Sequence, residues 1–151
     1  MVETETIARL RAVISRTARH LNATATAEGL TPTQASVLGL ISARGPLGLT
    51  ELAELEGLNP TMLSRVVGRL TELELIRRHQ DPADLRAVRV EATQKGKRLH
   101  TRIRALRTTA VAECLDRLPQ ESAERLVAAI PALEELAEQL RAAHLSGGPR
   151  S

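Results

Sequence analysis

The chain of 151 residues contains no phenylalanine, tyrosine or tryptophan. Proteins that bind single-stranded nucleic acid stack bases on aromatic rings, so this absence argues against that class. The core, and the wall of any ligand pocket, must be aliphatic. A single cysteine, Cys114, excludes an intramolecular disulfide and a cysteine-based zinc site. Because Cys114 falls on an apolar helical stripe, we expect it to be a buried structural thiol.

Long hydrophobic runs are also absent. No segment approaches the roughly 20 apolar residues that cross a bilayer. No apolar run follows a basic start, as it would in a signal peptide. We therefore expect a cytoplasmic, nucleoid-associated protein that does not bind membranes.

The groups that carry catalysis are missing as well. No nucleophile, base and orienting group cluster along the chain, and no glycine-rich phosphate loop is present. Four histidines lack metal-ligand spacing: His20, His79, His100 and His144. We expect no metal, no cofactor and no enzymatic activity.

Positive charge is concentrated in the middle of the chain. Residues 1–60 carry 5 Arg and 6 Glu, and residues 108–151 carry 4 Arg and 7 Asp or Glu. Between them, residues 61–107 carry 12 Lys or Arg and 5 Asp or Glu, a net charge of +7. Such a basic region is typical of a polyanion-binding face, but ordinary solvated surfaces are basic too. Charge alone leaves both interpretations open.

Apolar spacing and capping residues predict two helices in residues 1–44. The first carries an apolar stripe through Ile7, Leu10 and Ile14 and ends before Gly29. The second starts at Thr31, with Pro32 in its first turn and Gln34 at the capping-box position, and ends before Gly45 and Pro46.

Two further helices follow in quick succession. A short helix over residues 50–56 ends at Gly57, which supplies a left-handed turn at low cost. Asn59 then caps the next helix, and Pro60 opens it. Two helices across so short a turn form a helix-turn-helix.

The apolar period changes from helical to two after this pair. Val88, Val90 and Ala92 alternate with polar positions and predict a strand, with residues 76–79 as its partner. The link between them, residues 81–84, reads Asp-Pro-Ala-Asp and is strong turn chemistry. A hairpin after a helix-turn-helix is a wing.

The C-terminal half is helical again. Thr93 caps a long helix that breaks at Leu118 and Pro119. The last helical region carries a heptad seam, which Pro131 is expected to kink. The flanking stripes exceed what one small core covers, so we predict a two-fold homodimer whose contacts are made by Ile7, Leu10, Ile14, Leu126, Ile130, Leu133 and Leu140.

Together these elements predict a mainly α-helical fold with a small β-hairpin wing, an α+β winged helix. Residues 1–30 form an N-terminal dimerisation helix, and residues 31–93 form the winged helix-turn-helix domain. Residues 94–145 form the C-terminal dimerisation helices, and residues 146–151 form a disordered tail.

The helix that opens at Pro60 separates into two faces at 100° per residue. Leu63, Val66, Val67, Leu70 and Leu73, joined by Glu74, fall on the inner face. The outer face is small, hydroxylic and basic, which suits base edges and phosphates in a major groove. Any amphipathic surface helix has similar features, so the prediction of DNA binding also depends on the turn before this helix and the wing after it. The candidate DNA contacts of this helix are Asn59, Pro60, Thr61, Met62, Ser64, Arg65, Gly68 and Arg69.

The wing supplies a second candidate contact. Arg86 follows the bend of the hairpin, where an inserted guanidinium would meet the concentrated negative potential of a narrow minor groove. Asp84 is placed to hold Arg86 by a charged hydrogen bond, which would also close the turn. The wing candidates are Arg77, Arg78, Asp84, Arg86 and Arg89.

From about Leu30 to Leu99 the sequence resembles the MarR family of winged helix-turn-helix regulators. The similarity lies in residues 30–34 (LTPTQ), 49–53 (LTELA), 59–70 (NPTMLSRVVGRL), 81–86 (DPADLR) and 90–96 (VEATQKG). The most specific part is Asp-x-Arg in the wing, leading to Thr-x-x-Gly. The resemblance implies a homodimer on a pseudo-palindromic double-stranded DNA operator, with Arg86 in the minor groove. It further implies a repressor of its own or a neighbouring promoter, released by a small apolar or acidic effector.

Four positions depart from the family pattern. An aromatic residue often stands near Ala35, and glycine usually ends the recognition helix where this chain has Glu74. Gly68 replaces a helix-favouring residue, which costs roughly 1 kcal/mol and permits closer approach to DNA. Pro131 interrupts the last helix. Two other functions fit the same fold: a protein-interaction module, and an architectural DNA binder without sequence preference.

Overall fold

The helix boundaries follow local signals in the sequence. In the computed structural model, which describes residues 1–146 and the side chains up to His144, seven helices and three strands form in the described part of the chain. Residues 147–151, most of the predicted tail, lie outside it. The elements are α1 (Thr4–Ala27), α2 (Pro32–Arg44), β1 (Leu47–Gly48), α3 (Leu49–Glu56), α4 (Pro60–Glu72), β2 (Ile76–Gln80), β3 (Val88–Ala92), α5 (Gln94–Asp116), α6 (Gln120–Ala128) and α7 (Ile130–Ser146).

The predicted caps are present. At the start of α2, the Thr31 hydroxyl accepts from the Gln34 amide at 3.2 Å, and the Gln34 side chain accepts from the Thr31 amide at 3.0 Å. At the start of α4, Asn59 Oδ1 accepts from the Met62 amide at 2.8 Å. Gly57 ends α3 in the left-handed conformation, with φ of 64°. The caps at Thr31 and Asn59 satisfy amides that helix starts leave without partners.

The sheet has one more strand than the sequence predicted. β3 lies in the middle, paired antiparallel with β2 and with β1. The expected hairpin, β2–β3, is confirmed, but β1 is only two residues long and shows no period. Its pairing places Leu47 opposite Val90, and both side chains are buried.

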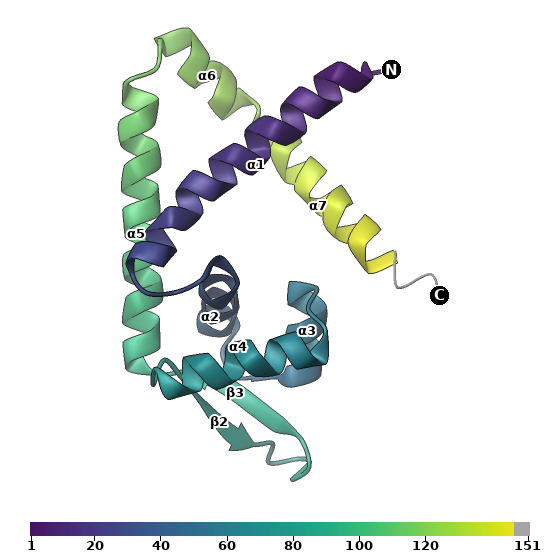
Figure 1. Cartoon of the computed structure of the whole chain (residues 1–151), viewed down its shortest axis with the longest axis vertical. Helices are drawn as coiled ribbons and strands as arrows, with labels where there is room; N and C mark the ends of the chain where they lie inside the picture. The colour runs from purple at the N-terminus through teal and green to yellow at the C-terminus, as the bar shows by residue number, and fades with distance from the viewer. Residues whose placement is uncertain (147–151) are drawn as a thin grey trace.

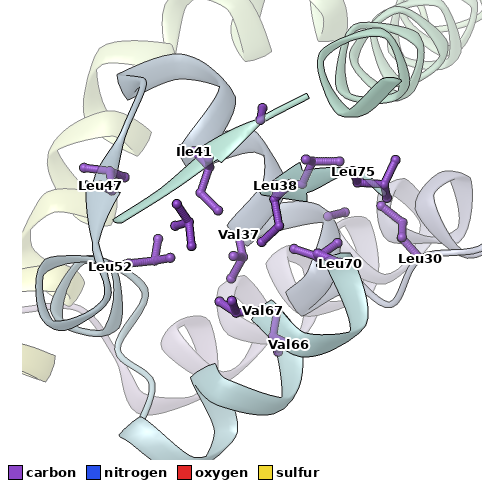
Figure 2. Packing of buried hydrophobic residues seen from close by; sticks show 14 of the residues in the cluster. Leu30, Val37, Leu38, Ile41, Leu47, Leu52, Val66, Val67, Leu70 and Leu75 are labelled. Atoms are coloured by element: carbon purple, nitrogen blue, oxygen red, sulfur yellow. The ribbon is translucent and has the colours of Figure 1, made fainter. Parts of the chain in front are cut away.

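The core is aliphatic and is centred on α2. Val37, Leu38 and Ile41 are fully buried and lie among α4, α3 and the sheet (Figure 2). Leu30, Leu47, Leu52, Val66, Val67, Leu70 and Leu75 complete the labelled cluster. No polar or charged residue in the described part of the chain is buried. The core therefore holds the helix-turn-helix and the wing as one unit.

The remaining helices form an open frame above this unit (Figure 1). α1 packs on α5, where the Arg107 guanidinium donates to the Leu21 carbonyl at 3.2 Å and Arg102 pairs with Glu28 at 3.2 Å. α6 follows α5, and α7 returns toward α3. None of the described helices is long and apolar enough to cross a membrane.

Two expectations about the C-terminal helices were wrong. Pro131 does not kink a continuous helix. The chain leaves α6 at Ala129, and Pro131 lies in the first turn of α7, where its missing amide costs nothing. Cys114 is exposed in the single chain rather than buried, although residues of α1 and α6 lie beside it.

α5 also packs on α2 through a histidine. The His100 ring lies 3.0 Å from where a Cβ atom of Gly39 would stand, so a larger residue at position 39 would require the ring to shift. Burial in this contact, with Arg104 and Arg107 nearby, lowers the pKa of His100. Close packing of α2 on α5 therefore favours the neutral imidazole.

The turn after α4 forms on a residue other than glycine. Glu74 has φ of 60°, in the left-handed region, and the Leu75 amide donates to the Leu70 carbonyl at 3.0 Å. Contacts from the start of α5 hold the turn. The Thr93 hydroxyl donates to the Glu74 carbonyl at 2.7 Å, and Lys95 Nζ donates to the Leu73 carbonyl at 2.9 Å.

Glu74→Gly should therefore stabilise the protein. Glycine removes the steric cost of the left-handed conformation and adds backbone entropy to the unfolded chain, so we expect a net gain of about 0.5–1 kcal/mol in the free energy of unfolding. Urea unfolding followed by circular dichroism measures it. Glu74→Ala, which deletes the same charge but keeps the strained backbone, is the control. Equal effects of the two variants would show that charge, and not backbone conformation, matters here.

Candidate nucleic-acid interface

Burial of the inner face of α4 determines which residues of this helix face outward. Leu63, Val66, Val67 and Leu70 are buried against the core, as helical periodicity predicts. Glu74 was wrongly assigned to this face, because α4 ends at Glu72 and Glu74 lies exposed beyond it.

The outer face of α4 carries small, hydroxylic and basic side chains at the surface. Arg65 has no ion-pair partner in residues 1–144, and Arg69 pairs with Glu72 at 3.3 Å in an exposed contact. Exposed pairs of this kind contribute little, so Arg69 can exchange its partner for a phosphate or a base. The exposed residues of this face are Thr61, Met62, Ser64, Arg65 and Arg69, together with the acidic Glu72.

Gly68 is not required by packing. A Cβ atom at this position would have no neighbouring atom within 4 Å, and its φ is not positive. Glycine in mid-helix therefore lowers helix stability, and neither packing nor backbone conformation requires it. What it provides is a shallow point on the outer face, where a second backbone or a base edge can approach closely.

The wing tip is held together by its two aspartates. Asp81 Oδ1 accepts from the Ala83 amide at 2.9 Å, and Asp84 Oδ1 accepts from the Arg86 amide at 3.0 Å. Asp81 also pairs with Arg89 at 3.4 Å. The expected bond between Asp84 and Arg86 is thus present, but it engages the backbone. It fixes the position of Arg86 and leaves the guanidinium unpaired within residues 1–144.

The arginines on the strands differ in what they contact. In the sheet register Arg77 lies opposite Glu91, and its guanidinium donates to the Glu91 carboxylate. That bond, with the positive charges nearby, lowers the pKa of Glu91. Arg78 is exposed and forms no ion pair in the part of the chain described. Arg78 and Arg86 are therefore the wing arginines most available to an external anion.

The two candidate surfaces lie next to each other. α4 packs on β2, and Figure 1 shows α4 beside the β2–β3 hairpin, whose tip projects away from the rest of the fold. The outer face of α4 and the wing arginines thus form one basic surface, which we call the reading surface: Thr61, Ser64, Arg65, Gly68, Arg69, Arg78 and Arg86. A helix for a major groove and a projecting arginine for a minor groove fit adjacent grooves of a duplex.

The residues predicted to form a dimer are all exposed in the single chain. α6 and the described side chains of α7 include no buried residue, and in α1 only Ala25 is buried. The exposed positions are Ile7, Leu10, Ile14, Leu126, Ile130, Leu133 and Leu140. The heptad seam is also divided, because Leu126 lies on α6 and the other seam positions lie on α7.

The sequence did not predict the residues that hold the end of α4 and the wing in place beneath the reading surface. Thr93 and Lys95 bind the carbonyls at the end of α4, and Glu91 neutralises Arg77. Local patterns identified Thr93 only as a cap of α5. Its second role depends on the turn at Glu74, which brings the start of α5 against the end of α4.

Comparisons with known proteins agree with this geometry. The sequence model of the MarR family matches residues 30–88. A comparison with curated protein sequences finds no match.

Several solved structures are similar over most of the chain. RV1404 from Mycobacterium tuberculosis is 28% identical with a TM-score of 0.76, and the match covers 89% of this chain and 94% of that one. A mutant of MarR from E.coli is 20% identical with a TM-score of 0.71, covering 93% and 97%. A mutant of MepR from S. aureus bound to an oligodeoxyribonucleotide is 18% identical with a TM-score of 0.66, covering 91% and 99%.

Proposed function

Residues 30–88 form a MarR-family domain, and from that premise we propose that the chain is a transcriptional regulator that binds double-stranded DNA in a sequence-specific way. The reading surface carries this proposal. α4 presents hydroxyls, a glycine and unpaired or weakly paired arginines, and the wing presents Arg86 on a backbone fixed by Asp84. The function of the family is transcription regulation and not catalysis, which agrees with the lack of a catalytic cluster in the sequence.

Each surface has its own role in the proposal. Ser64, Arg65 and Arg69 contact bases and phosphates in a major groove, with Gly68 allowing close approach. The amides at the start of α4 add a phosphate contact. Arg86 enters the neighbouring minor groove, and Arg78 contributes to the backbone contact.

We further propose a homodimer on a pseudo-palindromic operator. The exposed apolar faces of α1, α6 and α7 support it, because the described part of one chain leaves them exposed. A two-fold axis would place two copies of α4 in successive major grooves about 34 Å apart. In this proposal the protein represses its own or a neighbouring promoter, and a small effector releases it from DNA.

A titration tests the proposal directly. Labelled duplex from the region upstream of the gene, and random duplex of equal length, are titrated at several salt concentrations; the label is needed because the protein has no aromatic residue. Tight, salt-sensitive binding to the upstream duplex at two chains per site is the expected result. Equal affinity for both would indicate an architectural DNA binder. No binding at low salt would favour a protein-interaction module.

Arg86→Ala should weaken operator binding by about 1–3 kcal/mol, because an unpaired guanidinium is lost from the minor groove. Arg77→Ala is the matched control. It removes the same charge from the wing, but a side chain already paired with Glu91, so we expect a smaller loss. Both affinities are measured with the dimer on the same duplex. Normal operator binding by the Arg86→Ala dimer would refute the wing assignment.

A further inference from the structure

The end of α7 touches the helix-turn-helix of its own chain. The His144 ring lies against Gly57, where the Nε2 atom is 2.8 Å from the position of an added Cβ atom. In Figure 1 the C-terminal end of α7 descends toward α3. The described end of α7 therefore packs against the turn between α3 and α4.

A cavity of about 600 Å³ opens between these elements. This volume falls in the range of small-molecule sites. Its walls come from α3, the turn after it and the start of α4, and among the described side chains of α7 only His144 lines it. The aliphatic part of the lining consists of Leu49, Ala53, Leu58, Pro60 and Leu63.

The polar side chains of the lining are unused by the protein. Thr50, Glu54, Ser64 and His144 line the cavity, and none of the four makes a side-chain hydrogen bond or ion pair within residues 1–144. Apart from His144, Glu54 is the only ionisable residue among these four. The cavity thus combines an aliphatic wall with one uncompensated carboxylate.

We infer that this cavity binds a small aliphatic molecule carrying one cationic group. The aliphatic wall takes the hydrocarbon part, Glu54 pairs with the cation, and the hydroxyls of Thr50 and Ser64 accept its remaining hydrogens. The sequence alone suggested an apolar or acidic effector. An acid is disfavoured here because it would lie beside the Glu54 carboxylate.

Occupancy of the cavity is coupled to the reading surface. Pro60 and Ser64 line the cavity and are also candidate DNA contacts at the start of α4. A ligand that fixes Ser64 and the end of α7 changes how α4 meets the groove, and by linkage DNA changes the affinity for the ligand equally. This step rests on the proposed DNA-binding function, whereas the ligand site itself does not.

Three probes of the same shape test the ligand class: cyclohexylmethylamine, cyclohexylmethanol and cyclohexanecarboxylate. Calorimetry gives their affinities for the full chain, and methyl NMR of Leu58 and Leu63 locates them. We expect the amine to bind about fivefold more tightly than the alcohol, as one exposed ion pair provides, and the carboxylate to bind most weakly. Glu54→Gln should abolish the preference, while Glu51→Gln on the same helix should preserve it.

The outcomes separate this inference from the proposed function. No binding by any probe, methyl shifts elsewhere, or an amine preference that survives Glu54→Gln would overturn the site, even if the protein binds its operator. Amine binding without operator binding would keep the site and refute the regulator. In the wild type, saturating amine should weaken operator binding several-fold, and an unchanged operator affinity would refute the coupling.

Discussion

Gly96→Ala is expected to destabilise the protein by about 3 kcal/mol, the upper range for forcing an extra carbon into a packed site. Gly96 is buried in the first turn of α5, and a Cβ atom there would stand 2.0 Å from the Leu75 carbonyl oxygen. That oxygen is backbone and accepts from the Thr93 amide at 3.0 Å, so it has little freedom to move.

The loss of stability in the Gly96→Ala variant should also include the loss of neighbouring hydrogen bonds. Moving α5 away from Leu75 weakens the Thr93 cap, whose hydroxyl accepts from the Gly96 amide at 3.1 Å, and the bond from Lys95 to the end of α4. The Thr-x-x-Gly pattern is thus explained by a close approach of two backbones. Urea unfolding by circular dichroism measures the effect, at equal protein concentrations because a dimer's stability depends on concentration.

Gly68→Ala is the matched control for this prediction. Its Cβ atom meets nothing within 4 Å, so alanine should raise the free energy of unfolding by up to about 1 kcal/mol through better helix propensity. On the outer face of α4 the same methyl group should weaken operator binding. A Gly96→Ala protein as stable as the wild type would contradict the packing at the start of α5.

Local signals predicted most of the winged helix. Caps at Thr31, Asn59 and Thr93 act within one turn of their own residue, so the sequence determines them without the rest of the fold. The two faces of α4 follow from the helical period in the same way. The reading surface was predictable because its residues lie on one helix and one hairpin.

Features that depend on distant segments were not predictable. The two-residue strand β1 exists because β3 offers it a partner, and Glu74 takes a glycine-like conformation because the start of α5 supports the turn. Burial of Cys114 was inferred from its stripe on α5, but burial depends on how closely distant helices pack on that stripe, and the thiol is exposed. The contact between His144 and Gly57 joins the last helix to the third and has no local signal.

Leu133→Asp should convert the proposed dimer into monomers. Leu133 lies on α7 with 41% of its surface exposed in the single chain, so the substitution disturbs no core contact of the protomer. In a two-fold dimer each interface would receive two carboxylates at an apolar seam, and an unpaired charge buried in this way costs several kcal/mol.

The affinity for DNA should fall when dimerisation is lost. In a dimer, binding of one subunit to its half-site holds the second subunit at a high effective concentration near the other half-site. A monomer should therefore lose about 10²–10⁴-fold in operator affinity although its reading surface is intact. Analytical ultracentrifugation gives the mass, and circular dichroism confirms that the winged helix remains folded. Glu134→Gln, on the adjacent polar position of α7, should leave both mass and affinity unchanged. A dimeric Leu133→Asp protein would exclude α7 from the interface and leave α1 and α6 to form it.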